Sequence, residues 1–461
     1  MTALWTADAI AAQTGGREQG DFVASGVAFD SREVGPGDLF VALKGETTDG
    51  HRFVSQAFAQ GAAGAVVSEP VDGPHVLVDD TDAALNALAR GARQRMRGKV
   101  IGVTGSVGKT SVKEALFAAL ERAAPGHAHR SVKSYNNHVG VPLSLARMPA
   151  ASRYAVLEMG MNHAGELAQL TRLVMPHVAL ITAIAPAHAE FFADETAIAD
   201  AKAEIFQGLE PGGTAILPYD SPHRERLIGI ARRYTDSILT FGTSREADVR
   251  ASDTMRLEGG STLISARLPD TMLTFTLGMP GAHWLANALA VIAAVFAAGG
   301  DLAAAGLALA EMRGLPGRGE RHTITLAEGE ARLIDESYNA NPASMAATLA
   351  MLGRERGRRI AVLGEMRELG AGSARFHAGL ADPIREAGVE LALLVGPAMA
   401  PLAEALEGVT EFVHVADARA AEDRLRAILA PGDVILVKGS NAVGLGRMVE
   451  ALAGSRKSCS I

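Results

Sequence analysis

The feature that most constrains this chain is a glycine-rich turn that joins an apolar run directly to a helical pattern. Residues 100–104 read Val-Ile-Gly-Val-Thr, and residues 105–111 read Gly-Ser-Val-Gly-Lys-Thr-Ser. Apolar residues then recur at helical spacing, at Val112, Ala115, Leu116, Ala119 and Leu120. Buried strands that turn into amphipathic helices build α/β sheets, so the pattern predicts an α/β fold with this turn at the carboxyl edge of a sheet.

The turn itself predicts a phosphate site. Glycines let backbone N–H groups approach phosphate oxygens, and the N-terminus of the following helix adds partial positive charge. Lys109 is expected to neutralise phosphate oxygens and the Thr110 hydroxyl to ligate Mg²⁺. The strict motif has a glycine five residues before Gly108, where this chain has Val103, so other glycines must supply the turn. We predict that ATP is bound by Gly105, Ser106, Val107, Gly108, Lys109, Thr110 and Ser111; a glycine turn with an incidental Gly-Lys-Thr is the alternative.

Two further apolar runs end in residues that could hold a metal ion. Residues 154–157 lead into Glu158, and residues 178–184 lead towards Pro-Ala-His, ending at His188. Ligands of open α/β sheets gather at the carboxyl ends of the strands. A carboxylate and an imidazole at that edge could hold one or two Mg²⁺ ions. Alternatively, Glu158 is a surface cap and His188 a hydrogen-bonded core histidine.

The chain is long enough for more than one core. At 461 residues it falls in the range of about two to four domains, with three as the central expectation. A polar, basic stretch before residue 99 predicts one boundary near residue 95. The Gly- and Pro-rich segment 312–320 predicts a second linker. We therefore expect a small N-terminal α/β domain, a central domain with a mostly parallel sheet and a doubly wound C-terminal domain, at residues 1–95, 96–314 and 315–461.

The runs that we interpret as strands follow this division. In the first domain they are residues 22–29, 38–43, 62–67 and 75–78. In the central domain they are residues 154–157, 178–184 and 214–217, separated by helical patterns that predict crossover helices. In the third domain they are residues 331–334, 360–363, 391–395, 412–415 and 434–437.

Charge and apolar content exclude several classes of protein. The net charge of −8 argues against a nucleic-acid partner. Uncharged apolar stretches stay below the about 18 residues that a membrane span needs, and the longest candidate, residues 285–298, is interpreted as a buried helix. Cys459 is the only cysteine, so an intrachain disulfide cannot form. We expect a cytoplasmic monomer without membrane insertion.

Several motifs together resemble the Mur peptide ligases of bacterial cell-wall synthesis. They are the phosphate loop, Glu-Met-Gly-Met-Asn at 158–162, Pro-Ala-His at 186–188, Ala-Lys-Ala-Glu-Ile-Phe at 201–206 and Asp-Glu-Ser-Tyr-Asn-Ala-Asn-Pro at 335–342. The resemblance runs in order from Asp-Ser-Arg at 30–32 to Lys-Gly-Ser at 438–440. It implies a UDP-sugar domain, a central ATPase and a C-terminal Rossmann-like domain. The implied reaction activates a carboxylate as an acyl phosphate, which an amine then attacks.

The motifs match best the branch of the family that joins D-alanyl-D-alanine to UDP-N-acetylmuramoyl-tripeptide. The resemblance implies that the UDP-linked substrate contacts Asp30, Ser31, Arg32, Lys44, Gly45, Asp49, His51, Asn136 and Asn137. It implies that the amine substrate is framed by Arg367 and Lys438. Further ATP contacts are implied for Asn287, Arg321, Asn339 and Asn341. Without the resemblance, residues 30–32 would be a turn, and the asparagines at 339 and 341 an Asx turn before Pro342.

The resemblance also implies the catalytic and metal-binding residues. Lys109 is the phosphate-binding cation, one Mg²⁺ lies on Thr110 and Glu158, and a second lies on His188 and Lys202. The matching lysine of the family is carbamylated, which requires a neutral amine and hence a lowered pKa. A lone helical lysine is otherwise a solvated charge.

The sequence departs from the family pattern at one further position, and several alternative functions have to be compared with the one implied. The family usually has Asn after the histidine in Gly-Ala-His-Trp at 281–284, where this chain has Trp284. The sister ligase that adds a diamino acid carries Asp-Asn-Pro-Arg, a tetrapeptide missing from this sequence. Folate polyglutamate ligases lack the UDP-sugar domain. A P-loop kinase or a nucleotide-dependent binding protein could also use the loop at 105–111.

Overall fold

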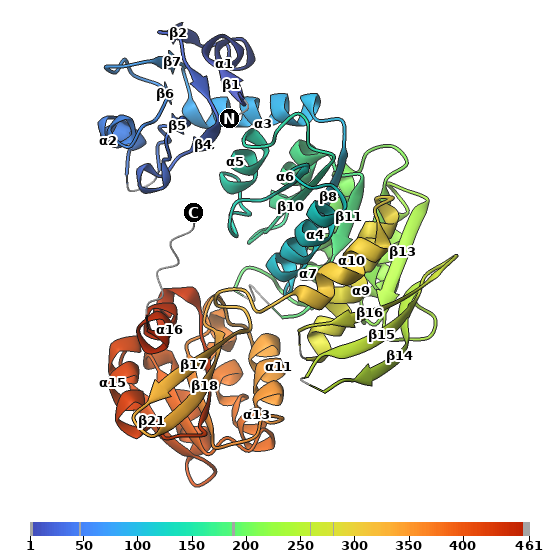
Figure 1. The fold of residues 1–461 in the computed structure, drawn as a ribbon, viewed down its shortest axis with the longest axis vertical. Helices are drawn as coiled ribbons and strands as arrows, with labels where there is room; N and C mark the ends of the chain where they lie inside the picture. The colour runs from blue at the N-terminus through green and yellow to red at the C-terminus, as the bar shows by residue number, and fades with distance from the viewer. Residues whose placement is uncertain (1–2, 46–47, 187–189, 259, 280, 455–461) are drawn as a thin grey trace.

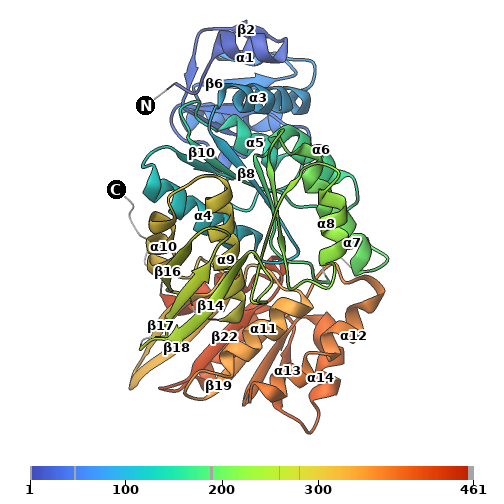
Figure 2. The same cartoon turned by 90° about the vertical axis from the view of Figure 1, so that its right-hand side faces the viewer.

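Three α/β domains follow one another along the chain in the computed structural model, which describes residues 3–45, 48–186, 190–258, 260–279 and 281–454. The N-terminal domain is blue, the central domain runs from cyan to yellow, and the C-terminal domain is orange to red (Figures 1 and 2). The predicted ligand His188 lies outside the described residues. The three-domain α/β prediction is confirmed.

The N-terminal domain is built on a sheet of order β2-β7-β6-β5-β4, in which only β2 runs antiparallel to its neighbour. The elements are α1 (Ala7–Thr14), β2 (Arg17–Gln19), β4 (Gly26–Ala28), β5 (Asp38–Val41), α2 (Val54–Ala59), β6 (Gly64–Val67), β7 (His75–Leu77) and α3 (Thr81–Arg95). A separate short pair joins β1 (Trp5–Thr6) to β3 (Val23–Ala24). The run predicted at 22–29 is therefore two strands.

The central domain has a sheet of order β16-β15-β14-β13-β12-β11-β8-β10-β9, parallel from β14 to β9. Its strands are β8 (Lys99–Thr104), β9 (Ala128–Arg130), β10 (Tyr154–Glu158), β11 (Val178–Ile181), β12 (Thr214–Pro218), β13 (Ser237–Gly242), β14 (Val249–Arg256), β15 (Thr262–Arg267) and β16 (Met272–Leu277). One core packs against α4 (Lys109–Ala123), α9 (Ala282–Ala297) and α10 (Leu302–Glu311). The other packs against α5 (Gly140–Ala146), α6 (Glu166–Val174), α7 (Glu195–Ala203) and α8 (Arg224–Ala231).

The predicted unit of strand, turn and helix forms the middle of this domain. Ile101 and Val103 of β8 face one core, and Val100 faces the other, as the alternation of a strand buried on both sides requires. The five apolar positions predicted to share a face of α4 are all buried. The predicted buried helix at 285–298 is the later part of α9. The strand predicted at 178–184 ends at Ile181, because the chain then turns to contact the glycine loop.

The C-terminal domain has a sheet of order β17-β18-β22-β19-β20-β21, in which only β17 pairs antiparallel. Its strands are β17 (Glu320–Leu326), β18 (Gly329–Glu336), β19 (Arg359–Gly364), β20 (Leu391–Val395), β21 (Glu411–Val415) and β22 (Val434–Lys438). One face packs α11 (Pro342–Leu352), α12 (Ser373–Ala378), α13 (Ala381–Glu386) and α14 (Ala400–Leu406); the other packs α15 (Ala418–Ile428) and α16 (Leu445–Ala453). Among the described residues, helices with the length and apolar content to cross a bilayer are absent.

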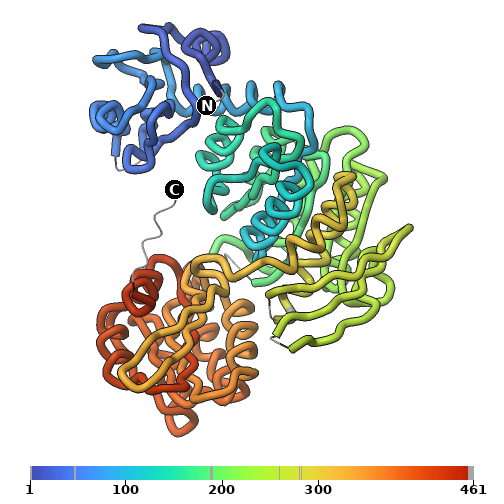
Figure 3. Tube along the Cα trace, in the orientation of Figure 1, coloured from blue at the N-terminus to red at the C-terminus, as the bar shows by residue number. Residues whose placement is uncertain are grey.

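Figure 3 traces the chain from the blue N-terminal domain into the central domain. Side-chain hydrogen bonds at α5 tie these two domains together. Trp5 Nε1 donates to the carbonyl of Ala146 at 2.8 Å, and Arg147 donates to the carbonyl of Val27 at 3.0 Å. The Arg95 guanidinium lies 3.9 Å from the centre of the Trp5 ring. Helix α3 ends at Arg95 and β8 begins at Lys99. The domain limits at 95 and 314 remain predictions.

The substitution Leu116→Ala tests how far the stability of the central domain depends on the buried face of α4. Leu116→Ala removes a side chain with 0% exposure, so it should lower the free energy of unfolding of the central domain by about 2–5 kcal/mol. Urea unfolding can be followed by Trp284 fluorescence in a Trp5→Phe background, because these are the only two tryptophans. Leu307→Ala on α10, where the side chain is 53% exposed, is the matched control. Equal losses in the two variants would contradict the packing described.

Candidate active site

The glycine turn after β8 has a backbone that only glycine adopts readily. Gly105 has φ +151° and Gly108 has φ +87°. A Cβ on Gly105 would lie 1.9 Å from Thr182 Oγ1, and that hydroxyl donates to the carbonyl of Val107 at 2.6 Å. Ser106 Oγ donates to the carbonyl of Ala185 at 2.9 Å. The segment that follows β11, with Thr182 and Ala185, therefore holds the glycine turn in place.

Lys109 lies at the first position of α4, directly after this turn. Its Nζ donates to the carbonyl of Gly105 at 2.7 Å, so the side chain folds back over the loop. Burial lowers the pKa of Lys109; Glu158 opposes this shift and Arg318 adds to it. The lysine is thus held over the backbone amides that the sequence predicts as a phosphate site.

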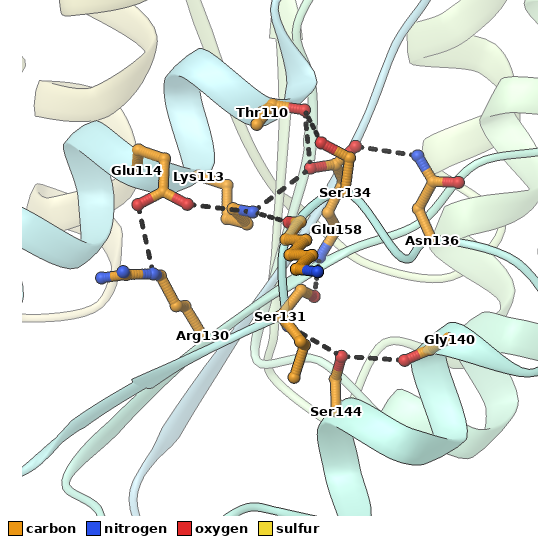
Figure 4. Close-up of polar contacts among 12 residues, drawn as sticks. Thr110, Lys113, Glu114, Arg130, Ser131, Ser134, Asn136, Gly140, Ser144 and Glu158 are labelled. Atoms are coloured by element: carbon orange, nitrogen blue, oxygen red, sulfur yellow. Dashed lines mark hydrogen bonds and ion pairs between the residues drawn. The ribbon is translucent and has the colours of Figure 1, made fainter. Parts of the chain in front are cut away.

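Glu158, the last residue of β10, is 1% exposed and reaches the start of α4 (Figure 4). Its Oε2 accepts from Thr110 Oγ1 at 2.9 Å, and its Oε1 accepts from Asn136 Nδ2 at 2.8 Å. Ser134 Oγ lies 3.2 Å from the Thr110 hydroxyl. Carboxylate and hydroxyl oxygens, as Glu158, Thr110 and Ser134 offer here, are hard donors of the kind that Mg²⁺ takes. The donor set around Glu158 therefore fits a magnesium ion.

A cavity of about 320 Å³ lies between the phosphate loop and the C-terminal domain. The central domain contributes Ser106, Val107, Gly108, Lys109, Thr110, Ser111, Ser134, Asn136, Glu158, His283, Trp284 and Asn287. The other wall includes Gly317, Arg318, Glu336, Tyr338, Asn339, Asn341, Ser344 and Lys438. Most of the residues that we predicted to bind ATP thus line this pocket, although they come from segments far apart in the sequence.

The C-terminal wall carries a buried ion pair. Lys438 is 2% exposed, and its Nζ donates to the carbonyl of Asn339 at 2.9 Å and lies 3.6 Å from Glu336 Oε2. Burial lowers the pKa of Lys438 and raises that of Glu336. Lys438, predicted to contact the amine substrate, therefore also borders the predicted ATP pocket.

Some predicted site residues lie elsewhere. Arg321 is on β17, where it pairs with Glu355 at 2.7 Å, outside the pocket. The pocket arginine is instead Arg318, which stacks 4.3 Å from the centre of the Tyr338 ring. Gly317 and Gly319 on either side of it both have positive φ. This Gly-Arg-Gly turn is the signal by which the sequence could have identified Arg318.

Three other predicted residues have local partners. Asn137 Oδ1 accepts from the N–H of Gly140 at 2.9 Å at the start of α5. Arg367 is 60% exposed and pairs with Glu365 at 3.1 Å. Asn341 lines the pocket and also caps α11, because its side chain accepts from Ser344 N at 2.9 Å. The Asx-turn alternative thus describes the local bonding of Asn341.

Of the residues predicted for the UDP-linked substrate, those from Asp30 to His51 lie in two turns of the N-terminal domain, whereas Asn136 and Asn137 belong to the central domain. Asp30 caps the short helix Ser31–Glu33 and pairs with Arg32 at 2.6 Å. Asp49 caps the helix Gly50–Phe53 and accepts from His51 Nδ1 at 2.6 Å. Ser31 donates to Gln56, Lys44 pairs with Glu69, and the N–H of Gly45 donates to the carbonyl of Thr48. Their assignment to the substrate remains a prediction.

Lys202 lies in the last turn of α7 and is 1% exposed. Burial, with a smaller contribution from Lys109, lowers the pKa of Lys202 well below its ordinary value. The alternative of a solvated surface lysine is therefore wrong. A neutral amine at this position is what carbamylation would require.

Family models match all three parts of the chain. The Mur ligase family, catalytic domain, matches residues 23–95; the Mur ligase middle domain matches residues 103–295; and the Mur ligase, glutamate ligase domain, matches residues 317–441. The fold and the phosphate-loop pocket define an ATP-dependent ligase, and the chain belongs to the Mur ligase family. It is 38% identical over 439 residues to the UDP-N-acetylmuramoyl-tripeptide–D-alanyl-D-alanine ligase of Escherichia coli (strain K12), covering 94% of each chain.

Solved structures of MurF ligases are also similar to this chain over nearly its whole length. A crystal structure of MurF from Acinetobacter baumannii has a TM-score of 0.83 at 32% identity, covering 97% of this chain and 98% of that one. MurF ligase from Thermotoga maritima in complex with ADP has a TM-score of 0.75 at 28% identity, covering 93% of this chain and 97% of that one.

His283 in the pocket wall gives a prediction about acid stability. Burial, helped by nearby Lys438, lowers the pKa of His283 from 6.5 to about 4. Below pH 6.5 the unfolded chain gains a proton that the folded chain takes up only near pH 4, so stability should fall as pH falls through this window. His283→Gln should weaken that dependence, measured as urea midpoints at steps across the window. Parallel pH dependences in the wild type and the variant would contradict a buried neutral imidazole.

Proposed function

We propose that this chain joins D-alanyl-D-alanine to UDP-N-acetylmuramoyl-tripeptide, with cleavage of ATP to ADP and phosphate, as a step of peptidoglycan precursor synthesis. The observation that carries the proposal is the pocket whose walls come from both the phosphate loop and the C-terminal domain. ATP and the substrate that accepts its phosphoryl group can then be bound next to each other. The Escherichia coli relative named above carries this activity in its name.

The pocket residues have defined tasks in such a reaction. Lys109 and the backbone amides of the loop at residues 105–111 hold the phosphates, and Thr110 and Glu158 would hold Mg²⁺. A bound Mg²⁺ would screen the charge of the terminal phosphate. A carboxylate oxygen of the tripeptide then attacks the γ-phosphorus, the bond from that phosphorus to the bridging oxygen of ADP breaks, and the products are ADP and an acyl phosphate. The neutral amine of the dipeptide attacks the acyl carbon, phosphate leaves, and the amine proton is lost to solvent.

The three domains divide the substrates in this proposal. The turns at Asp30 and Asp49 hold the UDP-linked substrate, and Asn136 and Asn137 face its peptide. Asn287 lies by the adenine, and Arg318, which lines the pocket, replaces Arg321 beside the phosphates. The segments with Arg367 and Lys438 frame the dipeptide. Because the pocket walls come from two domains, release of products requires these domains to separate.

The proposal also covers the partners of the protein, its cellular compartment and its oligomeric state. Both co-substrates are small molecules, so a nucleic-acid partner is not required. The sole cysteine, near the end of the sequence, fits a reducing compartment, and we place the enzyme in the cytoplasm as a monomer.

The activity test is a product assay. Purified protein with Mg-ATP, UDP-muramoyl-tripeptide and D-alanyl-D-alanine should give UDP-muramoyl-pentapeptide, identified by mass spectrometry, and one phosphate per product. Lys109→Ala should abolish phosphate release because the anionic phosphates lose their cation, while binding of the UDP-linked substrate stays unchanged. ADP formation with a phosphorylated product and no released phosphate would favour a kinase, and nucleotide binding without turnover would favour a binding protein. Full turnover by Lys109→Ala would exclude the assigned site.

We also propose that Lys202 is carbamylated. The reaction adds CO₂ to the neutral amine, forms an N–C bond and releases a proton, which leaves a carboxylate-like group able to ligate a second Mg²⁺. The burial of Lys202 and its lowered pKa support the required neutral amine.

Chemical rescue tests this modification. Lys202→Ala should lose activity because a metal ligand is missing, and a short carboxylic acid in the buffer should restore part of it by occupying the vacated space. Lys99→Ala, on the exposed first residue of β8, is the control and should respond to neither change. A Lys202→Ala variant that keeps full activity would contradict the proposal.

A further inference from the structure

Lys113 is a buried cation that the reaction as described does not use. It lies on α4, one helical turn after Lys109, and its side chain is 0% exposed. Its Nζ lies 3.0 Å from Glu114 Oε1 and 3.7 Å from Glu158 Oε2 (Figure 4). It also donates a hydrogen bond to the carbonyl of Lys133. The ammonium therefore connects the proposed metal ligand, its own helix and a loop that follows β9.

Carboxylates and cations alternate around Lys113, from Glu158 through Lys113 and Glu114 to Arg130. An ammonium taken out of water is costly unless carboxylates and acceptors surround it. Here Glu158, itself 1% exposed, faces Lys113 on one side, and Glu114 faces it on the other. Arg130 Nε lies 3.1 Å from the second oxygen of Glu114. Removing Lys113 would leave the carboxylates of Glu114 and Glu158 without the cation between them.

The loop that Lys113 holds is the one that shapes the metal site. Ser131 Oγ accepts from the N–H of Glu158 at 2.8 Å, Ser134 lies 3.2 Å from the Thr110 hydroxyl, and Asn136 donates to Glu158. Between them, Lys133 has φ +48°, a left-handed backbone that is unfavourable for a residue other than glycine. Such a conformation persists only where contacts impose it, and the hydrogen bond from Lys113 to the Lys133 carbonyl is one of these contacts.

We propose that Lys113 is a positioning residue for the magnesium-nucleotide site. It fixes the carboxylate of Glu158 by charge and fixes the loop of residues 131–136 by its bond to Lys133. Both actions place the oxygen atoms that Mg²⁺ would meet. The proposal rests on the proposed function, in which Thr110 and Glu158 hold the metal.

The readout that separates positioning from simple stability is the effect of Mg²⁺ on ADP affinity. Residues that orient metal ligands typically change metal affinity or activity by about 10- to 100-fold when they are replaced. We expect Lys113→Met to reduce the ratio of ADP affinity with Mg²⁺ to ADP affinity in EDTA by about that factor, while affinity in EDTA changes little. A purely structural lysine would lower the melting temperature and leave this ratio unchanged.

The experiment is titration calorimetry of ADP into the full-length protein, with Mg²⁺ or with EDTA. Arg122→Met is the matched control, because Arg122 is a charged residue on the same helix whose partner, Glu311, is 65% exposed. It should keep the wild-type ratio. Hydrogen exchange should show faster exchange of the amides of residues 131–136 in Lys113→Met than in Arg122→Met.

The outcomes are distinguishable. If the wild type binds ADP equally well with and without Mg²⁺, the proposed metal site fails. If the wild type depends on Mg²⁺ and Lys113→Met keeps the same ratio, the positioning role alone is overturned. Should Lys113→Met fail to fold, Lys113→Gln, which also removes the charge but keeps a polar amide, replaces it. A reduced ratio there supports the role, and a wild-type ratio overturns it.

Discussion

The site depends on the tight bend between β8 and α4, where the chain turns from strand into helix at the carboxyl edge of the sheet. Gly105 and Gly108 adopt backbone angles that other residues avoid, and Thr182 lies so close to Gly105 that a side chain there would collide with it. The parallel sheet places the ends of β10 and β11 beside this bend. Glu158 thus reaches Thr110 because neighbouring parallel strands end at the same edge.

Buried lysines surround this bend. Lys113, Lys202 and Lys438 are each no more than 2% exposed, and Lys109 lies among them. Cations removed from water attract anions more strongly than solvated ones do. Each has a different environment: Lys438 pairs with Glu336, Lys113 with carboxylates, and Lys202 has a pKa lowered by burial. The same residue type can therefore bind phosphate, position a ligand or accept a modification, depending on what surrounds it.

The sequence alone predicted the parts that local pattern determines. The face of α4, the strand ending at Glu158 and the parallel strands of the C-terminal domain all follow from apolar periodicity. The antiparallel strands β14 to β16 were missed because their outer residues, such as Met255 and Met272, are exposed and break the alternation. Arg318 was missed because an arginine in a glycine-rich linker resembles a solvated residue until Tyr338 packs against it. Lys113 gave no signal, because its partners at 133 and 158 come from other segments.

The most direct test of phosphoryl transfer to the peptide carboxylate follows an isotope. UDP-muramoyl-tripeptide labelled with oxygen-18 in its acceptor carboxylate is incubated with the protein, Mg-ATP and D-alanyl-D-alanine, and the released phosphate is weighed. The mechanism predicts that one labelled oxygen appears in the phosphate and the other remains in the new amide. Phosphate free of label would mean that water, rather than the carboxylate, attacks ATP, and would contradict the account.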